Sequence, residues 1–490
     1  MFTRKTKIIC SLGPSSSDES VIEQLINAGM NIARFNFSHG THETHKAVMR
    51  KVKNISNKLN KNVALLLDTK GPEIRTGLTE NGQTIKINNG DLVFVTADNS
   101  LSQAATNNSF AKISINWKDL PKKIKPNDKI LIADGLLELE VLSTDGTIVK
   151  CVAKNTGNIG SKKNVNLIGL HPNLPIINDQ DKKDLFLGTK EQVDFIAASF
   201  VSFASEIHEI RNFLKHIGSN AKIIAKIENE EGVKNITEIA EAADGIMIAR
   251  GDLGVQLPTE QIPLIQKKII SICHDLGKPV ITATQMLDSM IVNPRPTRAE
   301  LTDVANAIFD GTDAVMLSGE TANGAYPVEA VETMSKIAIT IEKSPEFCKK
   351  MIQNNNSELN YRKDSVSQIM AYNAYTIARD VKASVILTPT LTGNTSHLIS
   401  RYRPEQIIIA VTPNKTVARQ LILYWGVFPL ETKIAENYDE MITNAIKTAI
   451  DAKLVNFSDR IVLAAGLPLL KPTLLNAVRV LTINKTDFSE

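Results

Sequence analysis

Acidic and basic side chains follow two neighbouring apolar runs of the sequence, at the points where those runs end. Glu228 ends the run KIIAKIE, and Asp252 follows the run GIMIA. Two carboxylates brought together in this way can share one hard divalent cation, Mg²⁺ or Mn²⁺, and leave positions for substrate oxygens and water. Lys226 lies two residues before Glu228, on the same face of a strand, where its ammonium could stabilise a metal-bound phosphate. The alternative is that each acid only pairs with a nearby lysine or arginine.

A second group of polar residues follows two earlier apolar runs and carries one formal charge. Its amide, hydroxyl, carboxylate and carbonyl oxygens suit a monovalent cation better than a second Mg²⁺. Arg34 and Arg75 flank the group and could bind phosphate through two parallel N–H groups. Ordinary hydrogen bonding among these side chains is the alternative. The group consists of Asn36, Ser38, Asp68 and Thr69.

The segment ARGDLG contains Gly251, which opens a loop that leads into a helix. Backbone N–H groups exposed there could hold a carboxylate or a phosphate, although a loop glycine is more often just a turn residue. Thr284 and Glu320 end two later apolar runs. Charged and hydroxyl side chains at the ends of so many runs predict one shared site.

The apolar runs have the length and β-branched content of buried strands, and they alternate with amphipathic helical segments, as in parallel sheets built from βα units. Eight such units predict an α/β fold with a closed (β/α)8 TIM barrel, in which functional side chains lie at the carboxyl ends of the strands. Amphipathic helices are expected at 18–28, 204–217, 259–276 and 297–309. The expected strands are 6–12, 31–35, 63–67, 193–199, 222–227, 245–249, 280–284 and 314–318.

About 125 residues separate the third strand from the fourth, far more than a usual βα loop. The segments DLVFVTAD, KILIAD, LELEVLST and TIVKCVAK in this interval alternate with a period of two, and Asn-Gly and Asp-Gly turns lie beside them. They predict an inserted small β-barrel lid domain. After Ser344-Pro345, a helix at 366–379 and strands at 383–388, 406–411 and 460–465 predict a C-terminal α/β domain with a mostly parallel sheet.

The length of 490 residues agrees with about three domains of roughly 150 residues each. A net charge of +3 argues against a chain built mainly to bind nucleic acid or anionic membranes. The short apolar run near the N-terminus ends at a Gly-Pro turn, so we expect neither a signal peptide nor a membrane span. We therefore expect a cytoplasmic protein. The predicted boundaries are 1–70 for the first part of the barrel, 71–167 for the lid, 168–344 for the second part of the barrel and 345–490 for the C-terminal domain.

Six long segments closely resemble the pyruvate kinase family, and they occur in the family's order between residues 31 and 321. The resemblance implies transfer of phosphate from phosphoenolpyruvate to ADP, giving pyruvate and ATP in the last step of glycolysis. It also implies Mg²⁺ (or Mn²⁺) and K⁺ as cofactors, a hinged lid and a homotetramer. The segments are NIARFNFSHG, LLLDTKGPEIRTG, KIIAKIENEEG, GIMIARGDLG, VITATQMLDSMIVNPRPTRAE and DVANAIFDGTDAVMLSGET.

The resemblance also assigns roles to individual residues. Arg34, Lys226 and Thr284 are implied as catalytic, with Arg34 on the substrate phosphate and Lys226 on the transferring group; Thr284 would stand near the site of enolate protonation. Mg²⁺ would be held by Glu228 and Asp252, and K⁺ by Asn36, Ser38, Asp68 and Thr69. Substrate would contact Arg34, Lys226, Gly251, Asp252 and Thr284, and nucleotide would contact Asn36, Phe37, Ser38, His39, Arg75 and Lys163.

Glu73 bears on the potassium requirement. A glutamate at this position resembles the potassium-dependent members of the family, whereas a lysine resembles the potassium-independent ones. We therefore expect potassium dependence. The alternative is that Glu73 merely pairs with Arg75, two residues away.

The segment PTLTGNTSHLISRYRP resembles the phosphate-binding turn of the family's effector domain, so a sugar phosphate or AMP is a candidate effector. A capped helix start is the alternative. The turn lacks the basic residue that sugar-phosphate-regulated members often carry, and GLPLLKPTLLNAVRV replaces the Gly/Ser-rich loop expected near the end of the chain. The candidate residues are Thr390, Thr392, Gly393, Asn394, Thr395 and Ser396.

Two other functions are compatible with parts of this pattern. A magnesium-dependent lyase acting on pyruvate or phosphoenolpyruvate could also use Glu228 and Asp252, but it would need neither the lid nor the potassium group. The other is a nucleotide- or sugar-phosphate-sensing protein that has lost catalytic activity. Such a protein would be expected to lack Lys226 or one of the metal-binding acids, but Lys226, Glu228 and Asp252 are all present.

Overall fold

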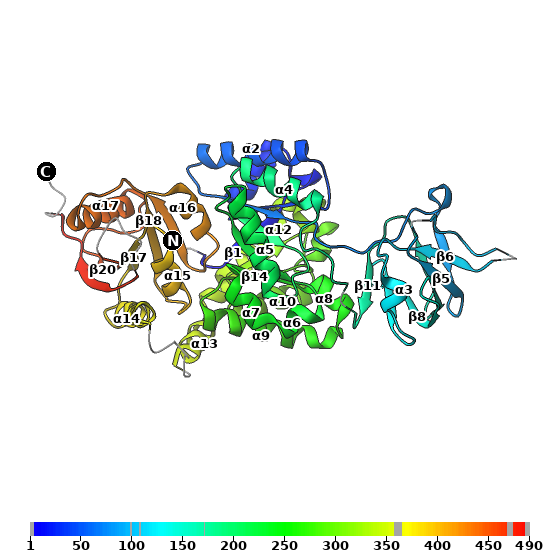
Figure 1. Cartoon of the computed structure of the whole chain (residues 1–490). Helices are drawn as coiled ribbons and strands as arrows, with labels where there is room; N and C mark the ends of the chain where they lie inside the picture. Colours follow the sequence, from blue (N-terminus) through cyan, green and yellow to red (C-terminus); the bar gives the residue numbers. More distant parts are fainter. Residues whose placement is uncertain are drawn as a thin grey trace.

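The structure is a computed structural model that describes residues 4–98, 100–106, 109–170, 172–356, 365–467 and 474–485. A central barrel carries the lid domain at one end and the C-terminal domain at the opposite end (Figure 1). No helix among these residues is both long and apolar enough to cross a membrane.

Eight parallel strands close into a barrel in the order β1-β16-β15-β14-β13-β12-β3-β2, which confirms the predicted (β/α)8 fold. Every strand is buried on both faces, as expected when helices cover the outside and side chains fill the inside. The observed bounds differ from the predicted ones by at most two residues at either end. The strands are β1 (Lys7–Ser11), β2 (Ile32–Asn36), β3 (Ala64–Asp68), β12 (Phe195–Ala198), β13 (Lys222–Ile227), β14 (Gly245–Ala249), β15 (Val280–Ala283) and β16 (Ala314–Leu317).

Helices surround the barrel, and the four that were predicted are present. The helix expected at 259–276 is preceded by a 3-10 turn, Thr259–Gln261, because Pro263 lacks an N–H and is tolerated only in the first turn of an α-helix. The helices are α1 (Glu19–Ala28), α2 (His42–Lys58), α4 (Asp179–Lys190), α5 (Ala204–His216), α6 (Glu230–Lys234), α7 (Ile236–Ala242), α8 (Arg250–Gln256), α9 (Ile262–Leu276), α10 (Arg298–Asp310), α11 (Gly319–Ala322), α12 (Pro327–Glu342) and α13 (Pro345–Asn356).

The inserted β domain is confirmed, and its strands form a six-stranded sheet, β11-β7-β8-β9-β5-β6, and a two-stranded sheet, β10-β4. Residues 74–77 pair with both outer edges of the larger sheet, through bridges from Arg75 to Asn164 beside β11 and from Thr76 to Ile115 beside β6, so this sheet closes on itself as the predicted small β-barrel. Five of the strands are only three or four residues long, and four of these, β4, β6, β10 and β11, were too short to be predicted from an alternating pattern in the sequence. The elements are β4 (Ile85–Ile87), β5 (Leu92–Thr96), β6 (Ala111–Ser114), α3 (Leu120–Lys123), β7 (Lys129–Ile132), β8 (Leu137–Thr144), β9 (Ile148–Ala153), β10 (Gly157–Ile159) and β11 (Val165–Ile168).

The C-terminal domain is an α/β unit with the strand order β19-β18-β17-β20-β21. Only β21 runs antiparallel to its neighbour, so the predicted mostly parallel sheet is confirmed. Strands β19 and β21 were not predicted from the sequence. Part of the atypical segment near the end of the chain, 468–473, lies outside the described residues. The elements are α14 (Val366–Asp380), β17 (Val385–Pro389), α15 (Asn394–Ser400), β18 (Ile407–Thr412), α16 (Lys415–Leu421), β19 (Val427–Glu431), α17 (Tyr438–Asp451), β20 (Arg460–Ala465) and β21 (Ala477–Thr482).

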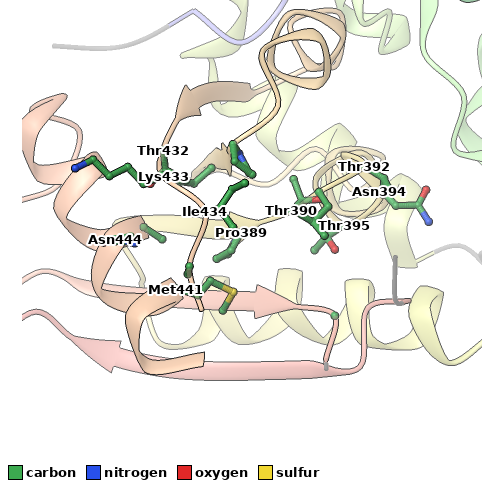
Figure 2. Close-up of a pocket in the computed structure, with 16 residues that line it drawn as sticks. Pro389, Thr390, Thr392, Asn394, Thr395, Thr432, Lys433, Ile434, Met441 and Asn444 are labelled. Carbon is green, nitrogen blue, oxygen red and sulfur yellow. The ribbon is translucent and has the colours of Figure 1, made fainter. Parts of the chain in front are cut away.

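A cavity of about 80 Å³ lies at the carboxyl ends of β17 and β18 in this domain (Figure 2). Thr390, Thr392, Asn394 and Thr395 form one wall, and Lys433 comes from the segment after β19. Two other members of the predicted effector group do not line this cavity. Ser396 is buried and hydrogen bonds to Thr388 at 2.7 Å, and the N–H of Gly393 donates to Thr390 Oγ1 at 2.9 Å.

The C-terminal domain closes the amino end of the barrel. Ile422 and Leu423 pack among the first inward-facing side chains of the barrel strands, such as Ile32 and Phe195. Directly beside this apolar contact, both guanidinium Nη atoms of Arg403 donate to the carboxylate of Asp313, at 2.8 and 2.9 Å. Each side chain of this pair is only 3% exposed. The pair therefore links the two domains in a place that water does not reach.

Replacing Arg403 by Ala should destabilise the protein by roughly 3–5 kcal/mol, because it leaves Asp313 buried without its counter-charge. The measurement is the change in unfolding midpoint by calorimetry or denaturant titration. The matched control is Arg379→Ala, which removes an exposed pair with Asp380 and should cost less than about 1 kcal/mol. Equal effects of the two substitutions would contradict the prediction.

Candidate active site

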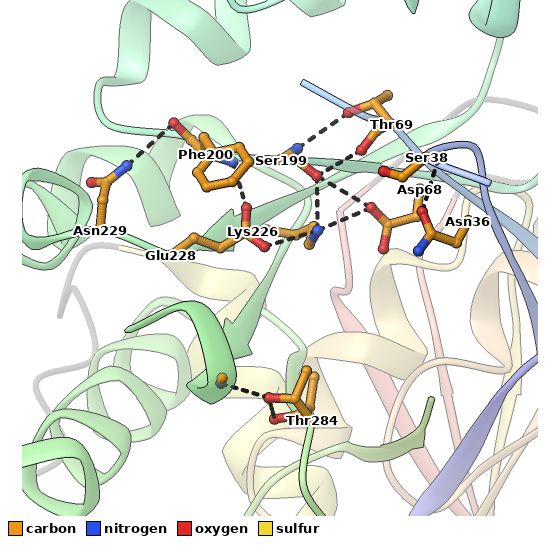
Figure 3. Close-up of polar contacts among 12 residues, drawn as sticks. Asn36, Ser38, Asp68, Thr69, Ser199, Phe200, Lys226, Glu228, Asn229 and Thr284 are labelled. Carbon is orange, nitrogen blue, oxygen red and sulfur yellow. Dashed lines mark hydrogen bonds and ion pairs between the residues drawn. The ribbon is translucent and has the colours of Figure 1, made fainter. Parts of the chain in front are cut away.

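The predicted site residues converge at the carboxyl ends of the barrel strands. Residue Asn36 of β2 lies opposite Asp68 of β3 in the sheet register, and Lys226 of β13 lies opposite Met247 of β14. Figure 3 shows Asn36, Ser38, Asp68, Thr69, Lys226 and Glu228 around one space, with Thr284 further along the barrel rim. Strand order alone explains this grouping, because parallel strands end at the same face of the barrel.

Lys226 is the centre of the polar network in Figure 3. Its ammonium lies 3.0 Å from Asp68 Oδ1, 2.9 Å from Glu228 Oε1 and 2.7 Å from Ser199 Oγ. Burial by itself would lower the pKa of Lys226, but the carboxylates of Asp68 and Glu228 outweigh burial and raise that pKa. Lys226 is therefore a buried, permanently charged cation with all three of its N–H donors in use.

Glu228 and Asp252 form the predicted carboxylate pair. Glu228 accepts a hydrogen bond from the N–H of Phe200 at 2.7 Å, and it is a hydrogen-bond partner of Asp252. Burial, followed by repulsion from Asp252, raises the pKa of Glu228 to about 7 against the opposing effect of Lys226. Burial also raises the pKa of Asp252. Two buried acids this close are favoured as anions only when a cation neutralises them.

Asp68 joins Lys226 to Arg34. Its Oδ2 accepts from Arg34 Nε at 2.7 Å, and Arg34 Nη1 donates to Ser11 Oγ at 2.6 Å. Burial would raise the pKa of Asp68, but Lys226 and Arg34 lower it below the ordinary value. Asp68 is therefore ionised. The predicted potassium group thus has its one carboxylate in the charged form that a cation requires.

The remaining members of that group lie beside Asp68. Asn36 Oδ1 accepts from the N–H of Ser38 at 3.0 Å, and the backbone oxygen of Thr69 accepts from Ser199 Oγ at 2.7 Å. These contacts are the ordinary hydrogen bonds that formed the alternative interpretation. They also bring side-chain and backbone oxygens into a single cluster that carries only one negative charge. Such oxygens are the kind of ligand that K⁺ binds.

Gly251 and Thr284 are directly bonded, because the N–H of Gly251 donates to Thr284 Oγ1 at 2.8 Å. The same hydroxyl donates to the carbonyl of Ala283 at 2.7 Å. Thr284 has a backbone φ of +65°, which is rare for a β-branched residue. The two residues therefore form one unit at the ends of β14 and β15.

The predicted nucleotide-binding residues are more dispersed. The ring of Phe37 stacks on His45 with centroids 4.3 Å apart, and the backbone oxygen of His39 is a hydrogen-bond partner of His45 Nε2 at 2.7 Å. Lys163 is part of the lid and is held through its backbone, whose N–H donates to Thr76 Oγ1 at 2.9 Å. No contact between the Lys163 ammonium and the barrel is present within the described part of the chain.

Arg75 stands at the junction between barrel and lid. It donates to Glu73 Oε2 at 2.7 Å and to the backbone oxygen of Lys162 at 2.9 Å. The hydrogen bond that Arg75 donates to Glu73 raises the pKa of Arg75. The pairing that was weighed as the alternative function of Glu73 is therefore present in this structure, so any effect of Glu73 on potassium would act alongside it.

Two residues that the sequence analysis did not single out belong to the site. Ser199 bonds to Lys226, to Thr69 and, at 3.3 Å, to Asp68 Oδ1, and thus joins the two predicted cation groups. Phe200 has a φ of +60°, and its N–H holds Glu228. Both follow β12 directly. Their position at the end of a predicted strand, 193–199, was the one available signal, and neither residue type by itself indicates ion chemistry.

A cavity of about 150 Å³ lies between the lid and the rim of the barrel and reaches Asp252. Residues of β11 line it on the lid side, and the start of α6 lines it on the barrel side. Gln256 of α8 donates to Asn166 Oδ1 of the lid across this interface at 3.3 Å. The lid therefore contacts the element that carries Asp252.

Comparisons with known proteins agree over nearly the whole length. The family models described as "Pyruvate kinase, barrel domain" and "Pyruvate kinase, alpha/beta domain" match residues 3–331 and 368–481. A pyruvate kinase from Clostridium acetobutylicum is 47% identical over 466 residues, covering 95% of this chain and 96% of that protein. One from Geobacillus stearothermophilus is 47% identical and covers 98% of this chain and 81% of that protein.

The solved structures include a closely similar fold. The crystal structure of a pyruvate kinase from Cryptosporidium parvum superposes with a TM-score of 0.91 at 40% sequence identity, covering 98% of this chain and 96% of that one. Matches of this length extend through the barrel, the lid and the C-terminal domain alike. The chain therefore belongs to the pyruvate kinase family of phosphotransferases.

Proposed function

We propose that this chain transfers the phosphoryl group of phosphoenolpyruvate to ADP, giving pyruvate and ATP in the last step of glycolysis, with a divalent cation and K⁺ as cofactors. The observation that carries the proposal is the buried Lys226 ammonium between Asp68 and Glu228. Asp68 belongs to the predicted K⁺-binding group, and Glu228 belongs to the predicted Mg²⁺-binding pair. A cation so placed can stabilise charge on phosphoryl oxygens without reorganisation during transfer.

The carboxylates of Glu228 and Asp252 fit a divalent ion. Burial and their mutual repulsion raise the pKa of Glu228 to about 7, and a divalent cation would remove that penalty. No group of three or more His, Cys, Asp or Glu side chains suited to a metal occurs in the described residues. An ion at the pair would take further ligands from substrate and water. When bound, Mg²⁺ neutralises charge on the phosphate oxygens.

The potassium group supports a monovalent ion for a different reason. Asp68 is ionised but already shared by Arg34 and Lys226, so little negative charge remains for a second divalent ion. Oxygens of Asn36, Ser38 and Thr69 complete a weakly charged donor set. We infer K⁺ at this place, in line with Glu73.

The protein's own groups would act in sequence during transfer. Arg34 and Lys226 would hold the phosphate and stabilise the charge that spreads over its oxygens as the bond to the enol oxygen breaks. The N–H of Gly251 and the hydroxyl of Thr284 would hold the carboxylate end of the substrate, and Thr284 would stand near the carbon that later takes up a proton. Lid closure would bring Lys163 and Arg75 to the nucleotide, beside Phe37 and His39, and exclude water.

The C-terminal cavity supports a regulatory site for a sugar phosphate or AMP. Threonine hydroxyls and Asn394 on one wall and Lys433 on another offer donors to a phosphate.

The family resemblance further implies a homotetramer. Size-exclusion chromatography with light scattering tests the assembly.

The proposed reaction predicts pyruvate formation from phosphoenolpyruvate and ADP, followed by coupling to lactate dehydrogenase. Turnover with Mg²⁺ and KCl should greatly exceed turnover with Mg²⁺ and NaCl, because Na⁺ is smaller than the ion inferred at Asp68. In a Glu73→Lys variant this difference should shrink. Absence of pyruvate under every condition would reject the function, whereas equal rates in both salts would reject only the potassium requirement.

Replacing Lys226 by Met should lower kcat by about 1,000-fold, because it removes the charge aimed at the phosphoryl group. Mn²⁺ binding, measured by electron paramagnetic resonance, should persist, since Glu228 and Asp252 remain. The matched control is Lys222→Met at the opposite end of the same strand, where the ammonium pairs with Asp244 at 3.2 Å. If the Lys226 variant turned over normally, its proposed role would be wrong.

A regulatory cavity predicts that Thr395→Glu removes activation by sugar phosphates or AMP, because a carboxylate there repels phosphate. Activity should be titrated with each compound at low phosphoenolpyruvate concentration. Thr395→Val is the control for loss of the hydroxyl without added charge. An unchanged response in the Glu variant would exclude this cavity, and no response in the unsubstituted protein would exclude regulation by these compounds.

A further inference from the structure

The turn that follows β15 is held in a conformation that its residues do not favour. Thr284 and Gln285 have φ values of +65° and +52°, in the left-handed region. Neither residue is a glycine, and a non-glycine residue in this region is strained, so it persists only where its surroundings enforce the conformation. Because the Gln285 side chain is exposed, packing of that side chain does not enforce it. Another group must therefore hold the turn.

Arg250 is that group. Its Nη2 donates to the carbonyl oxygens of Thr284 at 2.8 Å and Gln285 at 3.4 Å, and its Nε donates to the carbonyl of Ala283 at 3.3 Å. The same Nη2 lies 2.8 Å from the sulfur of Met286. One guanidinium thus binds three successive carbonyls of the strained turn. A planar fork of five donors can do this, whereas a lysine ammonium is a single point charge.

The guanidinium is itself fixed in place from outside the turn. Its Nη1 donates to Asp303 of α10 at 2.7 Å and to Gln266 of α9 at 3.4 Å. The Arg250 side chain is only 10% exposed. On the other flank of the turn, the buried Glu320 accepts from the N–H of Leu287 at 3.0 Å. The turn is therefore anchored to α9 and α10 on one side and to α11, which follows β16, on the other.

We propose that Arg250 is a positioning residue that sets the place of the Thr284 hydroxyl and the Gly251 N–H. The two groups bond to each other at 2.8 Å, and Arg250 is the residue before Gly251 while it binds the backbone of Thr284. It therefore ties the end of β14 to the turn after β15. The inference rests on the proposed function, in which these two groups hold the carboxylate of phosphoenolpyruvate.

A carboxylate ligand would take over these two donors from their present acceptors, Thr284 Oγ1 and the carbonyl of Ala283, so both donors must lie at fixed positions. If the turn relaxed to negative φ values, the Thr284 side chain would leave the direction in which it now meets Gly251. Displacement of about 1 Å in a positioning group costs on the order of 100-fold in rate. Arg250 acts here through Thr284 and Gly251, and it bonds to the backbone of the turn rather than to any residue of the Lys226 network.

The test is Arg250→Lys, which keeps the charge but loses the fork. We expect kcat/KM for phosphoenolpyruvate to fall about 100-fold, with a raised KM for phosphoenolpyruvate and a KM for ADP close to that of the unsubstituted protein. Arg211→Lys is the matched control, because Arg211 makes a comparable bond to Asp244 at 2.9 Å at the other end of the barrel. It should leave both KM values unchanged.

A double-mutant comparison separates positioning from general loss of structure. If Arg250 acts through the hydroxyl, then adding Arg250→Lys to Thr284→Ala should reduce kcat/KM much less than it does in the unsubstituted protein. Fully multiplicative effects, or an unchanged KM for phosphoenolpyruvate in the Arg250 variant, would overturn the proposal. Should Arg250→Lys fail to fold, Asp303→Asn removes its anchor from a partly exposed site and should raise the same KM. An inactive unsubstituted protein would instead reject the proposed function.

Discussion

The buried ammonium of Lys226 is the contact on which the rest of the active site depends. It lies between Asp68, which belongs to the proposed potassium-binding group, and Glu228, which forms a carboxylate pair with Asp252. Without this cation, the two buried carboxylates would lie close together with Asp252 nearby, and burial would favour their protonated forms. Its charge keeps Asp68 ionised, whereas Glu228, nearer to Asp252, still has a raised pKa. The two proposed cation-binding groups are therefore electrostatically connected through the Lys226 side chain.

The barrel separates this charged face from a face that serves stability. At the amino ends of the strands, Ile422 and Leu423 of the C-terminal domain pack into the barrel, and Arg403 pairs with the buried Asp313. At the carboxyl ends, polar groups satisfy one another and leave positions for ions and substrate. The strands that connect these faces are buried throughout and form a closely packed frame between them.

Three residues on the functional face have a backbone conformation that their side chains do not favour. Phe200, Thr284 and Gln285 all have positive φ values directly after barrel strands. Phe200 uses this conformation to direct its N–H at Glu228, and Thr284 uses it to meet Gly251. In both cases a charged side chain holds the strained backbone, Glu228 in the first and Arg250 in the second. Charge–backbone bonds thus position the groups that the chemistry would require.

The amino-acid sequence by itself determined the eight barrel strands, the insertion and the C-terminal α/β domain, because periodicity and turn residues are local properties of the chain. It also predicted Lys226, Glu228 and Asp252 as partners, since spacing along β13 and the shared face of parallel strands follow from strand geometry. Only the tertiary structure decided how the lid strands pair, that Ser199 joins the two cation groups, and that Arg250 binds the turn of Thr284. Those contacts join residues far apart in the sequence. They form only when the atoms are placed to within a few tenths of an ångström, and no local sequence pattern encodes such placement.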